Sequence, residues 1–253
     1  MPYLIYNDLK IYYQETTGRE PLMIFVHGAG GSSRRWSAQL EALKGLYRAV
    51  ALDLPGHGQS GGKPLASITE YAELVAGFVD ALHSRKFVLA GHSMGGAIAL
   101  EFTLCHAEKL QGLILVGTGA RLRVNPQVLG TLAGGELPLH NINNLFGSAV
   151  PQSLVQSFRR EMEELPAALY LADYQACDSF DRMSDIQKIK VPTLIIVGDE
   201  DKMTPVKYAQ YLNNQIANSR LKIIYGAGHM TMLEKPREVN EAIIDFLNMI
   251  RAN

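Results

Sequence analysis

The sequence predicts an α/β fold: a doubly wound, mostly parallel sheet of eight strands with helices on both faces. Two observations predict it. Short apolar runs recur along the chain, and stretches with the three- and four-residue spacing of an amphipathic helix separate them. Strands that alternate with helices form parallel sheets, because each helix crosses one face and returns the chain to the same end. The 253 residues, 47% of them hydrophobic, suffice for a large buried core.

Eight segments have the character of strands. Residues 4–6 and 10–15 are short and are joined through Asn7 and Asp8, a turn signal. The other six are continuous apolar runs, which are typical of strands covered on both faces. They are residues 22–27, 48–52, 87–90, 112–116, 193–197 and 221–225.

Four segments have helical spacing, at residues 65–83, 94–105, 206–216 and 236–250. Ser67 or Thr69 could cap the first of them. Residues 94–105 are apolar nearly all round, which predicts an interior helix. Pro236 suits the first turn of the last helix, where a missing N–H costs nothing.

Residues 121–185 interrupt the alternation of strands and helices. They contain helical patterns but no convincing strand, and several Gly and Pro residues divide them into short pieces. We therefore expect a core domain made of residues 1–120 and 186–253, with residues 121–185 as a helical insertion between two strands of the sheet. A plain extension of the core is the alternative.

Charge and cysteine content exclude several functions. The formal net charge is -1 and no polybasic segment occurs, so neither nucleic acid nor an anionic membrane surface is an expected partner. The N-terminus lacks the features of a signal peptide, and no run is long enough to span a bilayer. Cys105 and Cys177 match no zinc spacing. They fit a reducing cytoplasm, although a bridge between them stays possible.

The most informative stretch is Gly91-His92-Ser93-Met94-Gly95, which lies between a predicted strand and a predicted apolar helix. A Gly-x-Ser-x-Gly turn in this context presents a serine hydroxyl at a sharp, strained bend. The two glycines let the strand and the helix approach each other closely. The alternative is a glycine-rich turn whose serine has no catalytic role. The predicted strand before the motif and the predicted helix after it favour Ser93 as a nucleophile.

A second glycine-rich loop, His27-Gly28-Ala29-Gly30-Gly31, follows the predicted strand at residues 22–27. A tetrahedral intermediate needs two N–H donors aimed at its oxygen. Met94, directly after the nucleophile, and Ala29 would supply them. A phosphate-binding loop is excluded, because no Gly-Lys-Ser/Thr follows. His27 precedes the serine at a strand end, and we interpret it as a residue that organises the loop.

A serine nucleophile needs a basic histidine and an acid that orients it. In this topology the order along the chain is serine, acid, histidine. His229 follows the last predicted strand and is the histidine that fits. The acid follows the strand at residues 193–197, where Asp199, Glu200 and Asp201 compete. All these candidates lie past the carboxyl ends of strands, the edge at which open α/β sheets bind ligands.

Two arginines, Arg34 and Arg35, follow the glycine-rich loop and could meet a carboxylate of the substrate. We expect instead that both are solvated at the start of a helix, as most arginines are.

The motifs together resemble those of the α/β-hydrolase superfamily. They are the loop at 27–31, Asp53-Leu54-Pro55-Gly56-His57-Gly58-Gln59-Ser60, the serine turn, Gly198-Asp199-Glu200-Asp201 and Gly228-His229. The resemblance implies that Asp201, at the end of a Gly-x-x-Asp step, is the acid. It implies a structural role for the 53–60 loop and for Trp36, which would pack the first helix against the sheet. Residues 121–185 fit the slot of the family's lid, which follows the sixth strand.

The resemblance further implies a serine esterase that needs no metal and no organic cofactor. Small bacterial carboxylesterases, enol-lactonases, cofactor-free haloperoxidases and carbon–carbon bond hydrolases share these motifs, so lactone or carbon–carbon hydrolysis is the alternative activity. A small-molecule binding protein on this fold is a third. We expect a small ester as the partner, and a cytoplasmic monomer or homodimer. The residues expected to contact a small or medium acyl group are Gly28, Phe146, Phe158, Met162 and Tyr170.

Overall fold

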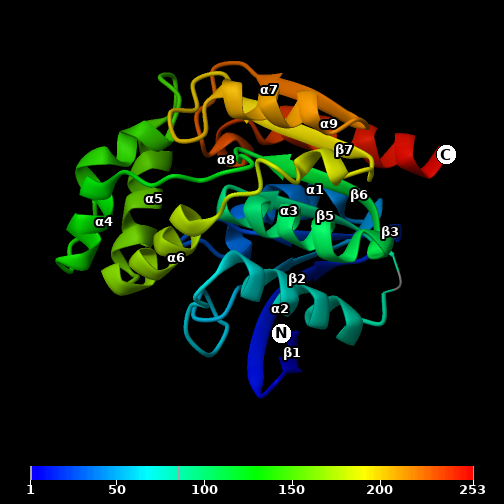
Figure 1. Cartoon of the computed structure of the whole chain (residues 1–253), viewed down its shortest axis with the longest axis horizontal. Coiled ribbons are helices and arrows are strands. Elements are labelled where there is room, and N and C mark those ends of the chain that lie inside the picture. Colours follow the sequence, from blue (N-terminus) through cyan, green and yellow to red (C-terminus); the bar gives the residue numbers. More distant parts are fainter. Residues whose placement is uncertain (1, 85, 253) are drawn as a thin grey trace.

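The structure is a computed structural model that describes residues 2–84 and 86–252. An eight-stranded sheet with the order β1-β2-β4-β3-β5-β6-β7-β8 forms its centre (Figure 1). β3 to β8 run parallel, while β1 and β2 are antiparallel to their neighbours. Each predicted strand overlaps one of these. They are β1 Tyr3–Tyr6, β2 Leu9–Thr16, β3 Arg19–Val26, β4 Tyr47–Leu52, β5 Phe87–His92, β6 Leu110–Val116, β7 Thr193–Gly198 and β8 Ser219–Ile224.

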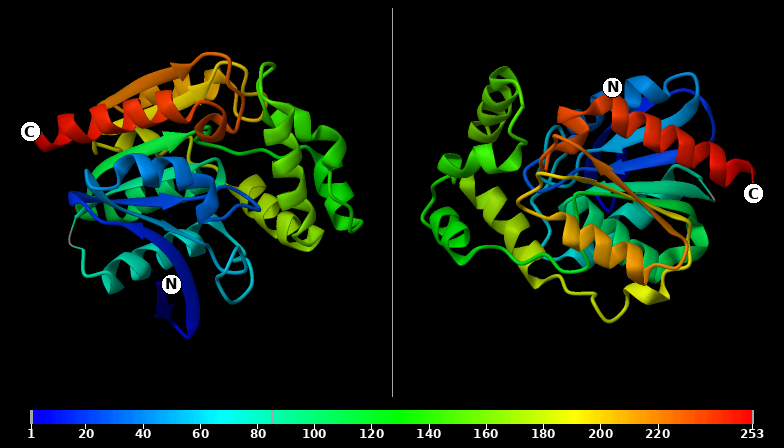
Figure 2. Two further views of the ribbon diagram at one scale, coloured as in Figure 1. Left: turned by 180° about the vertical axis from the view of Figure 1, so that it is seen from behind. Right: turned by 90° about the horizontal axis from the view of Figure 1, so that it is seen from above.

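Helices cover both faces of the sheet, which confirms the predicted fold class (Figures 1 and 2). Alternate side chains of β3 go to opposite faces: Ile24 joins the cluster under α2, α3 and α7, while Phe25 joins the cluster under α1 and α9. Trp36 is fully buried against Phe25, with ring centroids 4.8 Å apart. These helices are α1 Ser37–Leu43, α2 Ile68–Ala81, α3 Met94–His106, α7 Val206–Gln215 and α9 Pro236–Ala252.

Local signals define the ends of these helices. The Ser67 side chain accepts a hydrogen bond from the Glu70 N–H and so caps α2. Of the two predicted caps, Ser67 and Thr69, it is therefore Ser67 that acts. Pro236 begins α9. α3 is buried along nearly its whole length, as its apolar sequence predicts.

Residues 121–185, here called the cap segment, lie between β6 and β7 and form helices beyond one edge of the sheet (Figures 1 and 2). One isolated bridge joins Arg121 to Asp181 where the segment leaves and re-enters the core. The remaining elements carry the cap over the carboxyl ends of the parallel strands. They are α4 Pro126–Ala133, the 3-10 helix η3 Leu139–Leu145, α5 Gln152–Glu163 and α6 Ala167–Ser179.

The strand order reverses direction at β3, because β4 lies on one side of it and β5 on the other. Loops that leave the carboxyl ends of two such neighbouring strands diverge and leave a crevice. The β3 loop begins at His27 and the β5 turn holds Ser93. The two motifs predicted to act together are therefore neighbours in space.

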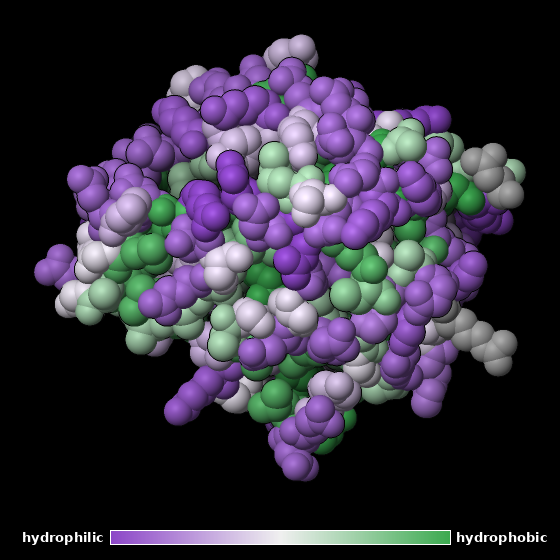
Figure 3. Space-filling view, viewed as in Figure 1, coloured by the Kyte–Doolittle hydropathy of each residue, from purple (hydrophilic) through white to green (hydrophobic). Residues whose placement is uncertain are grey.

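The face seen in Figure 3 is mostly hydrophilic, with small apolar patches over the cap segment and at several places over the core. In the described parts of the chain, no helix combines the length and the apolar character needed to cross a membrane. Cys105 and Cys177 are both free thiols, so the possible bridge between them does not form.

Candidate active site

Ser93 occupies the bend between β5 and α3. Its φ of 52° and ψ of -115° lie outside the regions that side chains favour, so the turn is strained. The Ser93 N–H donates to the Val116 carbonyl of β6 at 2.9 Å, which ties the turn to the sheet. The side chain is half-buried and lines a cavity under the cap segment. The strained bend is the one predicted from the sequence.

Glycines are required on both sides of this serine. A Cβ added to Gly91 would lie 2.0 Å from the Gly95 carbonyl oxygen, and one added to Gly95 would lie 2.3 Å from the Val26 carbonyl oxygen. Such distances are far below van der Waals contact, so any side chain would force the strand and the helix apart. The spacing of the motif therefore has a steric cause in this chain.

The β3 loop lies against the serine turn. A Cβ on Gly28 would lie 3.2 Å from the Ser93 Cβ, so the absence of a side chain permits the approach. Within the described residues, the N–H groups of Ala29 and Met94 have no hydrogen-bond acceptor, whereas the Gly30 N–H donates to Asp173 Oδ2 at 2.8 Å. Two free donors beside a serine hydroxyl form a site at which a negative oxygen can be stabilised.

His229 follows β8 and is paired with Asp201, which follows β7. The Nδ1–H of His229 donates to Asp201 Oδ2 at 2.9 Å, and both side chains are buried. In the neutral ring the single proton is on Nδ1, so Nε2 has a free lone pair and can accept a proton. His229 and Ser93 line the same cavity. The sequence order serine, acid, histidine thus corresponds to three side chains at one edge of the sheet.

The environment of Asp201 keeps its carboxyl group ionised. Burial raises its pKa, but the charge of His229 and the hydrogen bonds from His229 and Thr204 lower the pKa by more, so the net shift is downward. Thr204 donates through its hydroxyl to Oδ2 at 2.8 Å and through its N–H to Oδ1 at 2.9 Å. The Met203 N–H also donates to Oδ1. Thr204 was not anticipated, although a threonine three residues after an aspartate is a common local partner.

The two competing acids point elsewhere. Asp199 accepts from the Gly226 N–H at 2.7 Å. Glu200 accepts from the N–H of Ser148 at 2.7 Å and from its hydroxyl at 3.0 Å, so it links the β7 loop to the cap segment. Neither carboxylate hydrogen-bonds His229.

Two further histidines hold backbone in place. The Nε2–H of His92 donates to the His229 carbonyl at 2.9 Å, and burial lowers the pKa of His92 to about 3. His27 accepts from the Leu54 N–H at Nε2 and contacts the Gly28 carbonyl through Nδ1. Burial lowers the pKa of His27 well below its usual value, so both rings are neutral. This agrees with the interpretation of His27 as a loop-organising residue.

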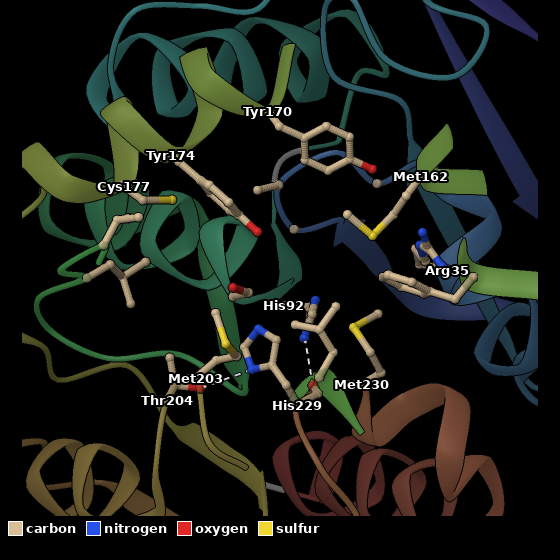
Figure 4. Close-up of a pocket in the computed structure, with 18 of the residues that line it drawn as sticks. Arg35, His92, Met162, Tyr170, Tyr174, Cys177, Met203, Thr204, His229 and Met230 are labelled. Carbon is tan, nitrogen blue, oxygen red and sulfur yellow. Dashed lines mark hydrogen bonds between the residues drawn. The ribbon is translucent and has the colours of Figure 1, made fainter. Parts of the chain in front are cut away.

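The cavity beside Ser93 lies between the core and the cap segment (Figure 4). Tyr170, Tyr174 and Cys177 of α6 form one wall, and Met203 and Met230 approach from the core. Of the residues expected to contact the acyl group, Gly28, Phe158, Met162 and Tyr170 line the cavity. Phe146 is absent from the described lining. It packs edge-on against Phe158, with centroids 5.3 Å apart, and touches the backbone of the loop before His229.

The expectation that Arg34 and Arg35 are both solvated is wrong for Arg35. Arg34 is exposed, but Arg35 is only 6% exposed and lines the cavity. The short 3-10 helix η1 Ser33–Trp36 turns it inward, under the cap segment. Its guanidinium lies 3.9 Å over the Phe158 ring and 3.1 Å from Glu161, both from α5. Its burial therefore depends on residues more than a hundred positions away.

A buried carboxylate of the cap segment was also not anticipated. Asp173 on α6 is fully buried and accepts from the Gly30 N–H, from His57 Nε2 at 2.8 Å and from the Tyr71 hydroxyl at 3.0 Å. The other ring nitrogen of His57 contacts the Pro55 carbonyl at 3.0 Å. Because both contacts are to acceptors, the ring carries two protons and a positive charge. The available signal was weak: Asp173 is flanked on α6 by the apolar residues Ala172 and Tyr174, but the same helix also contains Gln175 and Asp178.

The loop at residues 53–60 has the structural role that the resemblance implied. Asp53 accepts from the N–H groups of Ser33 and Gln59 at 2.6 and 2.8 Å. His57 binds Asp173. Neither side chain lines the cavity beside Ser93 within the described lining. Over residues 2–84 and 86–252, no group of three or more His, Cys, Asp or Glu side chains could hold a metal ion.

The family of this chain follows from comparison with known proteins. The model of the Alpha/beta hydrolase family matches residues 23–242, which is most of the chain. The chain belongs to this family. It is a hydrolase, and its eight-stranded, mostly parallel sheet with flanking helices agrees with that membership.

This α/β hydrolase is similar to several proteins that are named for hydrolytic activities. A solved structure of a thermophilic esterase is 36% identical, with a TM-score of 0.87, and the match covers 98% of this chain and 97% of that one. The 2-hydroxy-6-oxo-6-phenylhexa-2,4-dienoate hydrolase of Comamonas testosteroni is 28% identical over 95% of this chain and 92% of its own. The 3-oxoadipate enol-lactonase 1 of Acinetobacter baylyi is 25% identical, covering 91% and 90%.

Proposed function

We propose that the protein hydrolyses carboxylic esters of small or medium acyl groups through a Ser93–His229–Asp201 triad. One observation carries the proposal: a strained serine beside two free N–H donors shares a cavity with a histidine that a buried carboxylate orients. The similarity to a thermophilic esterase supports the choice of an ester.

The chemistry proceeds in two halves. Ser93 Oγ attacks the carbonyl carbon while His229 Nε2 takes its proton, and the N–H groups of Ala29 and Met94 hold the oxyanion. His229 then gives the proton to the departing alcohol, which leaves an acyl group on Ser93. In the second half His229 deprotonates a water that attacks the acyl carbon, and the proton returns to Ser93 as the acid is released. Asp201 holds the ring and stabilises its cation throughout.

A substrate panel tests the reaction class. We expect turnover of p-nitrophenyl acetate or butyrate with an initial burst if deacylation is slow, and labelling of Ser93 by an organophosphonate. Enol-lactones and dienoic keto acids belong in the same panel, because relatives are named for hydrolysis of such compounds. If the enzyme turns over one of these compounds faster than every simple ester, the proposed reaction changes from ester hydrolysis to hydrolysis of a lactone or of a carbon–carbon bond. Tight ligand binding without any product would favour a binding protein instead.

The pH dependence of hydrolysis should show one acid limb, because the proposed chemistry needs a neutral imidazole as its base and imidazoles generally change charge between about pH 5 and 8. The downward pKa shift of Asp201 keeps that carboxylate ionised over this range, so kcat/KM should rise with pH and then level off. Initial rates with a neutral ester at constant ionic strength measure the profile. A flat profile from pH 5 to 8 would contradict a histidine base.

A further inference from the structure

The cavity beside Ser93 contains a buried cation that the proposed chemistry does not use. Arg35 reaches the cavity from η1, directly after the β3 loop, and Figure 4 places it on the side opposite Cys177. Burial lowers the pKa of Arg35 and the charge of Glu161 raises it, but an arginine remains charged in proteins. A charge held at this depth costs free energy unless a partner compensates for it.

The partners of Arg35 within the protein compensate it only in part. Nη1 lies 3.1 Å from Glu161 Oε2, but the Glu161 side chain is 38% exposed, so solvent screens its charge. Among the described residues, this ion pair and the face of the Phe158 ring are the side-chain contacts of the guanidinium group. Arg35 borders two hollows: the outer one also includes Glu161 and Glu164, while the other is the cavity beside Ser93. On the cavity side no carboxylate of the described lining competes for the guanidinium group, so a ligand can reach it there.

The charge of the cavity wall has one sign. Its described lining includes Arg35 and Arg123 and no Asp or Glu; Arg123 is largely exposed and lies 3.8 Å from Asp181, which leaves Arg35 as the buried cation of this wall. The rest of the wall is mainly apolar or aromatic. A neutral acyl chain gains nothing from a cation in this position. A carboxylate matches it, because its two oxygens fit the guanidinium fork.

We propose that Arg35 binds a carboxylate of the substrate, so that the preferred esters or lactones carry a second, ionised carboxylate besides the bond that is cleaved. This inference rests on the proposed function of Ser93, and it specifies the substrate class of the same site. Arg35 is then a specificity-determining residue.

The wild-type protein provides the first test. We compare mono-p-nitrophenyl glutarate with its neutral counterpart, in which an amide replaces the free carboxylate. A charge-assisted contact predicts a kcat/KM at least about tenfold higher for the anionic ester, mainly through a lower KM. A second pair, p-carboxyphenyl acetate against phenyl acetate, places the charge on the alcohol. Whichever pair shows the preference identifies the side of the substrate that Arg35 contacts.

Variants assign the preference to Arg35. Arg35→Gln should remove it, lowering kcat/KM for the anionic ester about tenfold or more while the neutral ester changes little. Arg34→Gln removes the same charge from the adjacent, exposed position and is the matched control, which should keep the preference. Glu161→Gln removes the competing carboxylate and should keep or increase the preference, and it gives an answer even if Arg35→Gln fails to fold.

Three results would overturn the inference: no preference in either pair, equal losses for anionic and neutral esters in Arg35→Gln, or a loss of preference in Glu161→Gln. In each case continued hydrolysis of the neutral ester leaves the proposed function intact. If no ester is cleaved and the organophosphonate does not label Ser93, the proposed function itself fails.

Discussion

Ser93→Ala should lower kcat for ester hydrolysis by a factor of about 10⁴ to 10⁶, the loss seen when a triad nucleophile is removed elsewhere. The physical reason is that no other hydroxyl occupies the bend at the start of α3, so no covalent acyl intermediate can form. Alanine keeps a side chain at the same strained φ of 52°, so the fold should persist. Single-turnover and steady-state assays with p-nitrophenyl butyrate measure the effect.

The control for this variant is Ser153→Ala, at an exposed serine of α5 that is remote from the serine turn. It should retain the wild-type rate. Thermal melts of both variants should resemble that of the wild type. Hydrolysis retained by folded Ser93→Ala would rule out Ser93 as the nucleophile.

Asp173→Ala should destabilise the protein by about 3–5 kcal/mol, because it leaves a buried imidazolium and two other buried donors without an acceptor. The donors are His57 Nε2, the Tyr71 hydroxyl and the Gly30 N–H. Since Gly30 is next to Ala29, kcat should also fall where the variant remains folded. Urea unfolding gives the free-energy difference. Asp173→Asn, which keeps one carbonyl acceptor, should cost less.

This destabilisation should depend on pH with a defined sign. Burial lowers the pKa of His57, but the hydrogen bond and charge of Asp173 raise it by more, so the net pKa is above its usual value. A group whose pKa is raised on folding stabilises the fold at pH below its unfolded value, and this contribution is lost as pH rises through the folded value. The loss caused by Asp173→Ala should therefore be larger at pH 6 than at pH 9. A loss that grows with pH would contradict a charged His57.

Glu163→Gln is the matched control for Asp173. Glu163 also belongs to the cap segment, but it makes an exposed contact with Arg159, four residues earlier on α5. Exposed pairs of this kind contribute only a few tenths of a kcal/mol, so its unfolding should follow the wild type at both pH values.

The parts of the site that could be predicted are those with short-range causes. The serine turn needs glycines two positions before and after Ser93, and that requirement is visible in five residues. His229 and the three acids follow strand ends, so their common edge follows from the parallel sheet. The choice of Asp201 could not be made from position along the chain. It depends on which carboxylate turns toward His229, and Asp199 and Glu200 are engaged by Gly226 and Ser148.

The parts that could not be predicted depend on the cap segment. Arg35 has the sequence context of a solvated helix start, and it is buried because Phe158 and Glu161 of α5 cover it. Phe146 and Phe158 have similar sequence character, yet the first packs behind the second. Such contacts join residues far apart in the sequence, and no local pattern carries them.

The buried position of Asp173 limits how freely caps could be exchanged between hydrolases. The acceptor belongs to the cap segment, while the donors at Gly30, His57 and Tyr71 belong to the core. A cap grafted from another protein would have to place a carboxylate at the same point. Otherwise the charged imidazolium of His57 would be buried without an acceptor. In this chain the two parts are therefore not interchangeable modules, and sequence changes in one of them constrain the other.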